Sequence, residues 1–178
     1  MPQKIDMRCR RIGFSMQSVE IVGATGTIID VDSFLDRMNE LTDERVLVLN
    51  ADIVCGRDHL LSAVSHAARA FERGRNVSST LAMETLLYAS GERQIQRATK
   101  KTGISEGEAR LVLVFFREGG ADDVLLSAGL RRDDSVLSPS KEKLIRFGIG
   151  TEEIGAVPDR DQADLVLERV AFVDLQKR

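Results

Sequence analysis

The 178 residues, 43% of them apolar and 30% charged, have the composition of one ordinary folded domain, and we treat residues 1–178 as that domain. No apolar run approaches the roughly 18 residues that a membrane helix needs, so we expect a cytoplasmic protein without a membrane partner. The two cysteines and two histidines are too few for the usual zinc clusters or cysteine-protease sites. We therefore expect no metal and no other cofactor, and we interpret Cys9 and Cys55 as buried apolar residues.

The first third of the chain predicts three strands and a helix. Residues 7–14 and 17–23 form an edge hairpin in this interpretation. Residues 30–44 carry apolar side chains at helical spacing, and the compact apolar run over 45–50 is typical of a buried strand.

The middle of the chain predicts three helices. The clearest one covers residues 57–73, and two more meet at a Ser-Gly break within residues 81–98. We expect Arg93 and Gln94 in the exposed first turn of the last of these helices. Backbone N–H groups without intrahelical partners lie there, and they suit phosphate groups or the carbonyl groups of another chain.

The final third predicts a central strand over 109–117 and several short helices. The first covers 122–130. The second reaches Phe147 and begins at Ser138–Ser140, which supply a cap and a first-turn proline. A further turn opens at Thr151, and a last helix begins near Asp161. In that last helix the buried stripe comprises Leu165, Val166, Val170 and Val173. Because strands and helices do not alternate regularly, we predict an α+β domain with helices packed on a small mixed or antiparallel β-sheet.

Charge is distributed unevenly along the chain. Residues 57–101 contain eight basic and four acidic side chains, whereas residues 118–176 contain thirteen acidic and seven basic ones. Arg93, Arg97, Lys100 and Lys101 are spaced to form a stripe along one helix, and such a stripe can follow a nucleic-acid backbone. Ordinary solvated surfaces explain the same pattern equally well.

The segment Ile21–Gly26 is reminiscent of a dinucleotide-binding turn, because glycines there allow the backbone to approach a pyrophosphate. The third glycine of that motif is missing and no helix start follows it. We therefore interpret Gly23–Gly26 as a hairpin turn.

Two further positions have a structural and a functional interpretation. His59 is either a structural histidine near a helix end or a ligand contact close to Asn50 and Arg57. Gln94 is either a free polar contact or half of a capping box that starts at Gly91, with Arg93 bridging to a neighbouring carbonyl.

Four segments together carry a family resemblance: Leu49–Asp52 with His59 following, Met83–Ile95 with its Ser-Gly-Glu-Arg-Gln-Ile ending, Phe147–Ile149, and Leu167–Ala171. From about Arg45 to its end, the chain resembles the PRPK-binding proteins, the small accessory subunits of the KEOPS complex, in their archaeal type. Ser79 departs from the pattern, because the family commonly has Asn at this position.

The resemblance implies a non-catalytic subunit of the machinery that places threonylcarbamoyl on the adenosine beside the tRNA anticodon (t6A modification). It implies docking on the kinase-like ATPase subunit of KEOPS and indirect contact with the other KEOPS subunits. It also implies binding of tRNA by its single-stranded 3′ CCA end.

Eight residues are the candidate RNA contacts. Four cations would hold phosphates and four polar side chains would add hydrogen bonds: Arg57, Arg93, Arg97 and Lys100, then Asn50, His59, Ser90 and Gln94. The chain has no tryptophan and one tyrosine, so base stacking would use Tyr88, arginine planes or aliphatic walls. Two alternatives stay open: a pure protein-interaction regulator of the kinase subunit without RNA binding, and an enzyme that binds a nucleotide at Gly23–Gly26.

Overall fold

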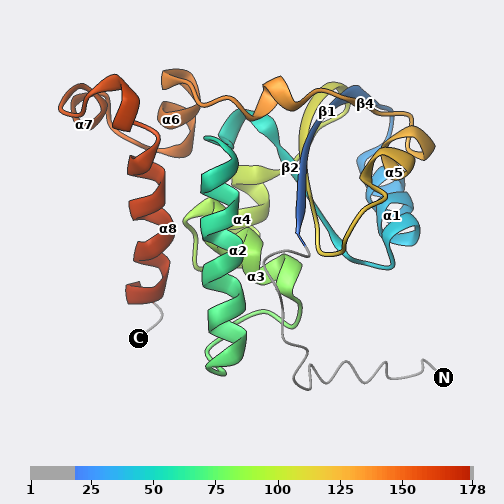
Figure 1. The fold of residues 1–178 in the computed structure, drawn as a ribbon, viewed down its shortest axis with the longest axis horizontal. Helices are drawn as coiled ribbons and strands as arrows, with labels where there is room; N and C mark the ends of the chain where they lie inside the picture. Colours follow the sequence, from blue (N-terminus) through green and yellow to red (C-terminus); the bar gives the residue numbers. More distant parts are fainter. Residues whose placement is uncertain (1–18, 177–178) are drawn as a thin grey trace.

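The computed structural model describes residues 19–176 as an antiparallel sheet with helices on both faces (Figure 1). Its strands are β1 (Glu20–Ile28), β2 (Val46–Asn50), β3 (Gly107–Phe115) and β4 (Arg131–Arg132), in the order β2-β3-β1-β4. Each neighbouring pair is antiparallel, and β1 and β3 pair over their full lengths. The predicted α+β class is confirmed, and the sheet is antiparallel throughout.

Two helices, α1 (Val31–Thr42) and α5 (Ala121–Ser127), cover the face of the sheet on the right of Figure 1. The smaller of two hydrophobic clusters lies between them and the sheet, and Met38 and Leu113 are completely buried in it. The α1 helix starts where the Asp30 carboxylate accepts the Ser33 N–H at 2.7 Å, which satisfies one of the free donors of the first turn.

The larger hydrophobic cluster lies on the other face of the sheet, under the remaining helices. The helices of this face are α2 (Arg57–Glu72), α3 (Leu81–Ser90), α4 (Ile95–Thr102), α6 (Lys141–Phe147), α7 (Thr151–Gly155) and α8 (Asp164–Gln176), and the short turns η2 (Ala51–Ile53), η3 (Asp134–Leu137) and η4 (Asp159–Asp161) link elements. The predicted buried stripe of α8 and the buried state of Cys55 are confirmed.

A polar contact holds α8 against its neighbours. Asp174 of α8 accepts a hydrogen bond from the Tyr88 hydroxyl of α3, and its other oxygen lies 2.7 Å from Nδ1 of His66 on α2. One carboxylate therefore joins three helices.

Three local expectations are wrong. The strand that we placed over 17–23 runs from Glu20 to Ile28 and pairs with β3 and β4, while its expected hairpin partner over 7–14 lies outside the described residues. Pro139 precedes the cap instead of following it, because the Ser140 hydroxyl caps α6. The last helix begins at Asp164, since residues 159–161 form a separate short turn.

Gly23 and Gly26 do not form the expected turn but lie within β1. A Cβ atom on Gly23 would approach the Asp133 carbonyl oxygen to 2.3 Å and the Val136 side chain to 2.6 Å. The Gly23 N–H donates to the Asp134 carboxylate at 2.8 Å. These glycines allow close packing of neighbouring backbone, and this packing accounts for them without a dinucleotide.

His59 joins α2 to α3 inside the larger core. Its Nδ1 accepts the Cys55 N–H at 3.2 Å, and its Nε2–H donates to the Ala89 carbonyl at 2.8 Å. The ring also meets Phe147 edge-on, at 5.3 Å between centroids. Burial lowers the pKa of His59 to about 4, because the charged imidazole loses its hydration there.

Substitution of Gly23 by Ala should lower the free energy of unfolding by about 1–3 kcal/mol, because the backbone that its Cβ meets cannot rotate away. Denaturant unfolding measures the change. Gly155→Ala is the matched control, because a Cβ there meets nothing within 4 Å. Equal stability of the two variants would contradict this account of Gly23.

The buried His59 should make stability depend on pH. Its folded pKa, about 4, lies below the unfolded value of 6.5, so the unfolded chain binds more protons between these values. The contribution of His59 to the free energy of unfolding is fully present above about pH 6.5. As the pH falls towards 4, about 3 kcal/mol of that free energy is lost. Urea unfolding of wild type and His59→Gln at about pH 7 and pH 4.5 isolates this loss; equal pH slopes in the two proteins would contradict it.

Candidate nucleic-acid interface

The corner between α3 and α4 is held by local backbone contacts. Gly91 takes a left-handed conformation, with φ of 68°, and its N–H donates to the Tyr88 carbonyl. The Glu92 N–H donates to the Leu87 carbonyl, and the Ser90 hydroxyl also accepts from it. This pattern is the usual glycine end of a helix, and it turns the chain sharply towards α4.

Lys101 crosses the inside of this corner. Its Nζ donates to the Ser90 carbonyl at 2.7 Å, lies 3.9 Å from a Glu92 carboxylate oxygen and sits 4.0 Å from the centre of the Phe147 ring. Burial lowers the pKa of Lys101. The prediction that Lys101 belongs to the exposed cationic stripe is wrong, because this lysine fixes the corner from inside.

The three other cations at the corner face solvent. Arg93 lies in the link before α4, and Arg97 and Lys100 are exposed positions of α4, whose buried residues are Ala98 and Thr102. Among residues 19–176, no carboxylate forms an ion pair with any of these three side chains. We call Arg93, Arg97 and Lys100 the corner cations.

The start of α4 differs from the expectation. The helix begins at Ile95, so Arg93 and Gln94 precede it instead of forming its first turn. Gln94 occupies the cap position and its side chain makes no capping hydrogen bond, so the capping-box interpretation is wrong. The first N–H groups of α4 thus lie at an exposed helix end, next to Arg93 and Arg97.

Two predicted polar contacts are buried instead. His59 uses both ring nitrogens within the core, and the Ser90 hydroxyl donates to the Leu87 carbonyl. Their exposed fractions are 1% and 0%. In this structure they support the corner from inside, and neither side chain has a free surface for RNA.

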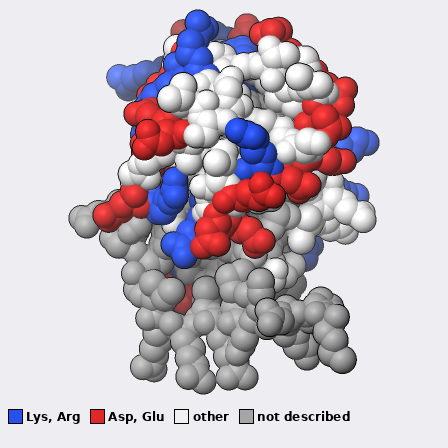
Figure 2. Space-filling view, turned by 90° about the vertical axis from the view of Figure 1, so that its right-hand side faces the viewer, with Lys and Arg blue, Asp and Glu red and all other residues white. Residues whose placement is uncertain are grey.

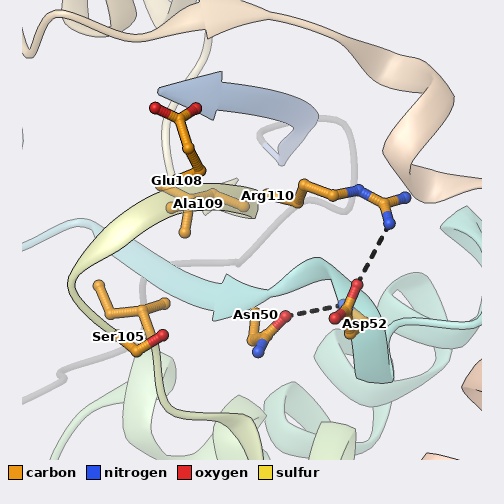
Figure 3. A pocket seen from close by; sticks show the side chains of 8 residues that line it. Asn50, Asp52, Ser105, Glu108, Ala109 and Arg110 are labelled. Atoms are coloured by element: carbon orange, nitrogen blue, oxygen red, sulfur yellow. Dashed lines mark hydrogen bonds and ion pairs between the residues drawn. The ribbon is translucent and has the colours of Figure 1, made fainter. Parts of the chain in front are cut away.

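Arg57 and Asn50 belong to other neighbourhoods. The Arg57 guanidinium donates to the Ile21 carbonyl of β1 at 2.8 Å, so it is directed to the sheet and not to the corner. The Asn50 side chain accepts the Asp52 N–H at 2.9 Å beside a small pocket of about 130 Å³ (Figure 3).

The Asp52 carboxylate at this pocket is shared by two arginines. Arg146 lies 2.6 Å from one oxygen and Arg110 lies 3.4 Å from the other; Figure 3 draws the Arg110 pair. The sequence contains no signal for this cluster, because its members come from distant segments. The arginines are already paired here, so the pocket offers less free positive charge than the corner.

Charge on the remaining surface is mixed. On the side of the molecule where α1 and α5 lie, Figure 2 shows acidic and basic side chains interspersed, with no continuous basic area. Among residues 19–176 there is no cluster of three or more His, Cys, Asp or Glu side chains placed to hold a metal ion. The same part of the chain has no helix that combines the length and the apolar character of a membrane span.

Comparison with known proteins identifies the family. The family model described as "Kinase binding protein CGI-121" matches residues 30–147. A regulatory protein Cgi121 from Methanocaldococcus jannaschii is 33% identical over 132 residues, which cover 73% of this chain and 83% of that protein. A KEOPS complex subunit Cgi121 from Pyrococcus abyssi is 34% identical over 112 residues, which cover 59% of this chain and 64% of that protein.

The match extends from the start of α1 to the end of α6 and so contains the corner, the larger part of the sheet and the helices that flank β2. It agrees with the resemblance that the sequence motifs indicate. On this match and on the identity to the first relative, the chain belongs to the CGI-121 family of kinase-binding proteins.

Proposed function

We propose that this chain is a non-catalytic subunit of a KEOPS complex that binds the kinase-like ATPase subunit and recruits tRNA by its 3′ CCA end. Membership in a kinase-binding family and a relative named as a KEOPS complex subunit support the first part. The exposed corner cations, without carboxylate partners among the described residues, are the observation that carries the second part.

The geometry of the corner suits a single-stranded backbone. Arg93 in the link before α4, together with Arg97 and Lys100 about one turn apart on α4, supplies exposed positive charge, and the free N–H groups at the start of α4 supply directed donors. Gln94 adds an exposed amide. Direct RNA contacts in this proposal therefore come from four of the eight residues that the sequence suggested, while His59 and Ser90 act as supports.

A second candidate function is that of a protein-interaction regulator that never binds RNA. It is favoured by the burial of Tyr88 and Phe147, because these two rings beside Gly91 offer no stacking surface in the part of the chain that the structure describes. Bases would have to lie on arginine planes or aliphatic side chains.

Charge reversal at the corner separates the two functions. The triple variant Arg93→Glu, Arg97→Glu, Lys100→Glu should bind tRNA at least about tenfold more weakly at low salt and reduce the salt slope by about 2, since each phosphate contact on a single strand contributes about 0.7. Filter binding over a salt series measures both. Reversal of Arg131, Lys141 and Arg160, exposed cations on other elements, changes net charge equally and should have little effect. Equal losses in both variants would contradict a specific role of the corner.

Removal of the CCA nucleotides from tRNA should weaken binding to the wild-type protein by about tenfold or more, because phosphate contacts and unpaired bases are lost together. The corner variant should show a much smaller difference between the two tRNAs. Undiminished binding of the shortened tRNA to wild type would contradict recruitment by the CCA end, and no tRNA binding at low salt would favour the regulator without RNA.

A further inference from the structure

Among residues 19–176, strand β2 lies at an edge of the sheet and pairs only with β3. The Arg45 carbonyl accepts the Phe116 N–H at 2.9 Å, and the same register continues along β2. In an antiparallel pair, backbone groups face the partner at every second residue. The N–H and C=O groups of Val46 and Val48 therefore point away from β3.

These outward groups have no partner in the described part of the chain. No hydrogen bond between residues 19–176 uses the outward N–H or C=O of Val46 or Val48. Unpaired groups along a strand edge are a template for another strand. Val46 and Leu47, whose side chains lie on opposite faces of the sheet, are each 7% exposed, so packing on both faces covers the side chains at this edge.

A cavity of about 580 Å³ follows this edge. It is bordered by the consecutive residues Val46, Leu47 and Val48. Because successive side chains of a strand point to opposite faces, a cavity on one face would meet only alternate residues. The cavity therefore runs along the free edge, between the α1 layer and the α3–α4 layer.

The walls of this edge groove are mainly apolar and partly exposed. The α1 wall contributes Leu35 and the opposite wall Ala82 and Met83, all of them half-buried. Asp32 borders the groove on the α1 side and Lys100 borders it on the α4 side.

The groove fits an extended polypeptide better than RNA. A strand provides backbone donors and acceptors in the spacing that β2 requires, and its side chains alternate between the two walls. Phosphate groups would meet the carboxylate of Asp32 at the α1 wall. The matching segment would place a basic side chain towards Asp32, while Lys100 at the opposite rim remains available to the corner.

We propose that the edge groove binds an extended segment of the kinase partner, which pairs with Val46 and Val48 as a fifth strand. This inference rests on the proposed function for the identity of the partner. The residues that border the groove span 31–104, which lie within the region that matches the kinase-binding family.

The test uses the full chain with the kinase subunit from the same organism. The amides of Val46 and Val48 should exchange at least about tenfold more slowly in the complex than in the free chain. Val48→Pro removes an outward N–H that β3 does not use, and proline is tolerated at such edge positions. It should weaken kinase binding by about tenfold or more in calorimetry, whereas Val48→Ala, which keeps the N–H, should weaken it much less.

A second variant keeps the test decisive if Val48→Pro does not fold. Met83→Glu places a charge in the groove while the Thr80 cap and the new glutamate form a favourable helix start. It should also weaken kinase binding by about tenfold or more. Val48→Pro, which changes no charge, should leave tRNA binding unchanged, because that binding depends on the corner cations.

The alternatives give distinct results. Kinase binding with unchanged exchange at Val46 and Val48 would overturn the inference and leave the proposed function standing, whereas no kinase binding at all would overturn both. Slow exchange of the Val46 and Val48 amides in the free chain that becomes fast on deletion of residues 1–18 would identify that segment as the occupant of the groove. Exchange that slows as the protein concentration rises would identify a second copy of the chain, and exchange that slows on addition of tRNA would identify RNA. Each of these results overturns the inference.

Discussion

The antiparallel pairing of β1 with β3 is the constraint on which the rest of the structure depends. Both strands are nine residues long and pair end to end, and helices on both faces cover the half that contains Ile21–Ala24 and Leu111–Phe115. Their backbone groups satisfy one another inside the molecule, where an unpaired group would be costly. Gly23 contributes directly, because only a residue without a side chain lets η3 approach β1 so closely.

The corner depends on this core through buried polar contacts. His59 ties the start of α2 to the end of α3, and Lys101 ties α4 to the carbonyl of Ser90. With one lysine used inside the corner, Arg93, Arg97 and Lys100 remain on the outside of a fixed turn. Rigid support of this kind lets a short cationic segment present its charge in one arrangement, which lowers the entropy cost of binding.

Periodicity and caps predict most of the helices because both depend on neighbours in sequence. The spacing of Leu60, Val64 and Phe71 indicates α2, and Gly91 and Gly103 mark the ends of α3 and α4. The antiparallel order of the strands does not follow from such signals, since β2 and β3 are separated by three helices. Gly23 and Gly26 show the same limit: a local interpretation favours a turn, whereas packing against distant residues places them within a strand.

The candidate site was predictable only in part for the same reason. The corner and its cations follow from local sequence, and they lie at the expected place with a shift of a few residues at the start of α4. The burial of His59 and Ser90 depends on contacts with other helices, and the pairing of Asp52 with Arg110 and Arg146 joins segments far apart in the chain. The edge groove likewise arises only when α1, β2, α3 and α4 come together.

The division of the apolar interior by the sheet has a consequence for how the protein tolerates sequence change. Away from the edge groove, which Met38 and Leu86 both border, side chains such as Leu125 and Leu87 belong to different clusters on opposite sides of the sheet. Substitutions at well-separated sites combine nearly additively. One layer can therefore diversify during evolution without compensating replacements in the other, provided that the strands between them keep their register.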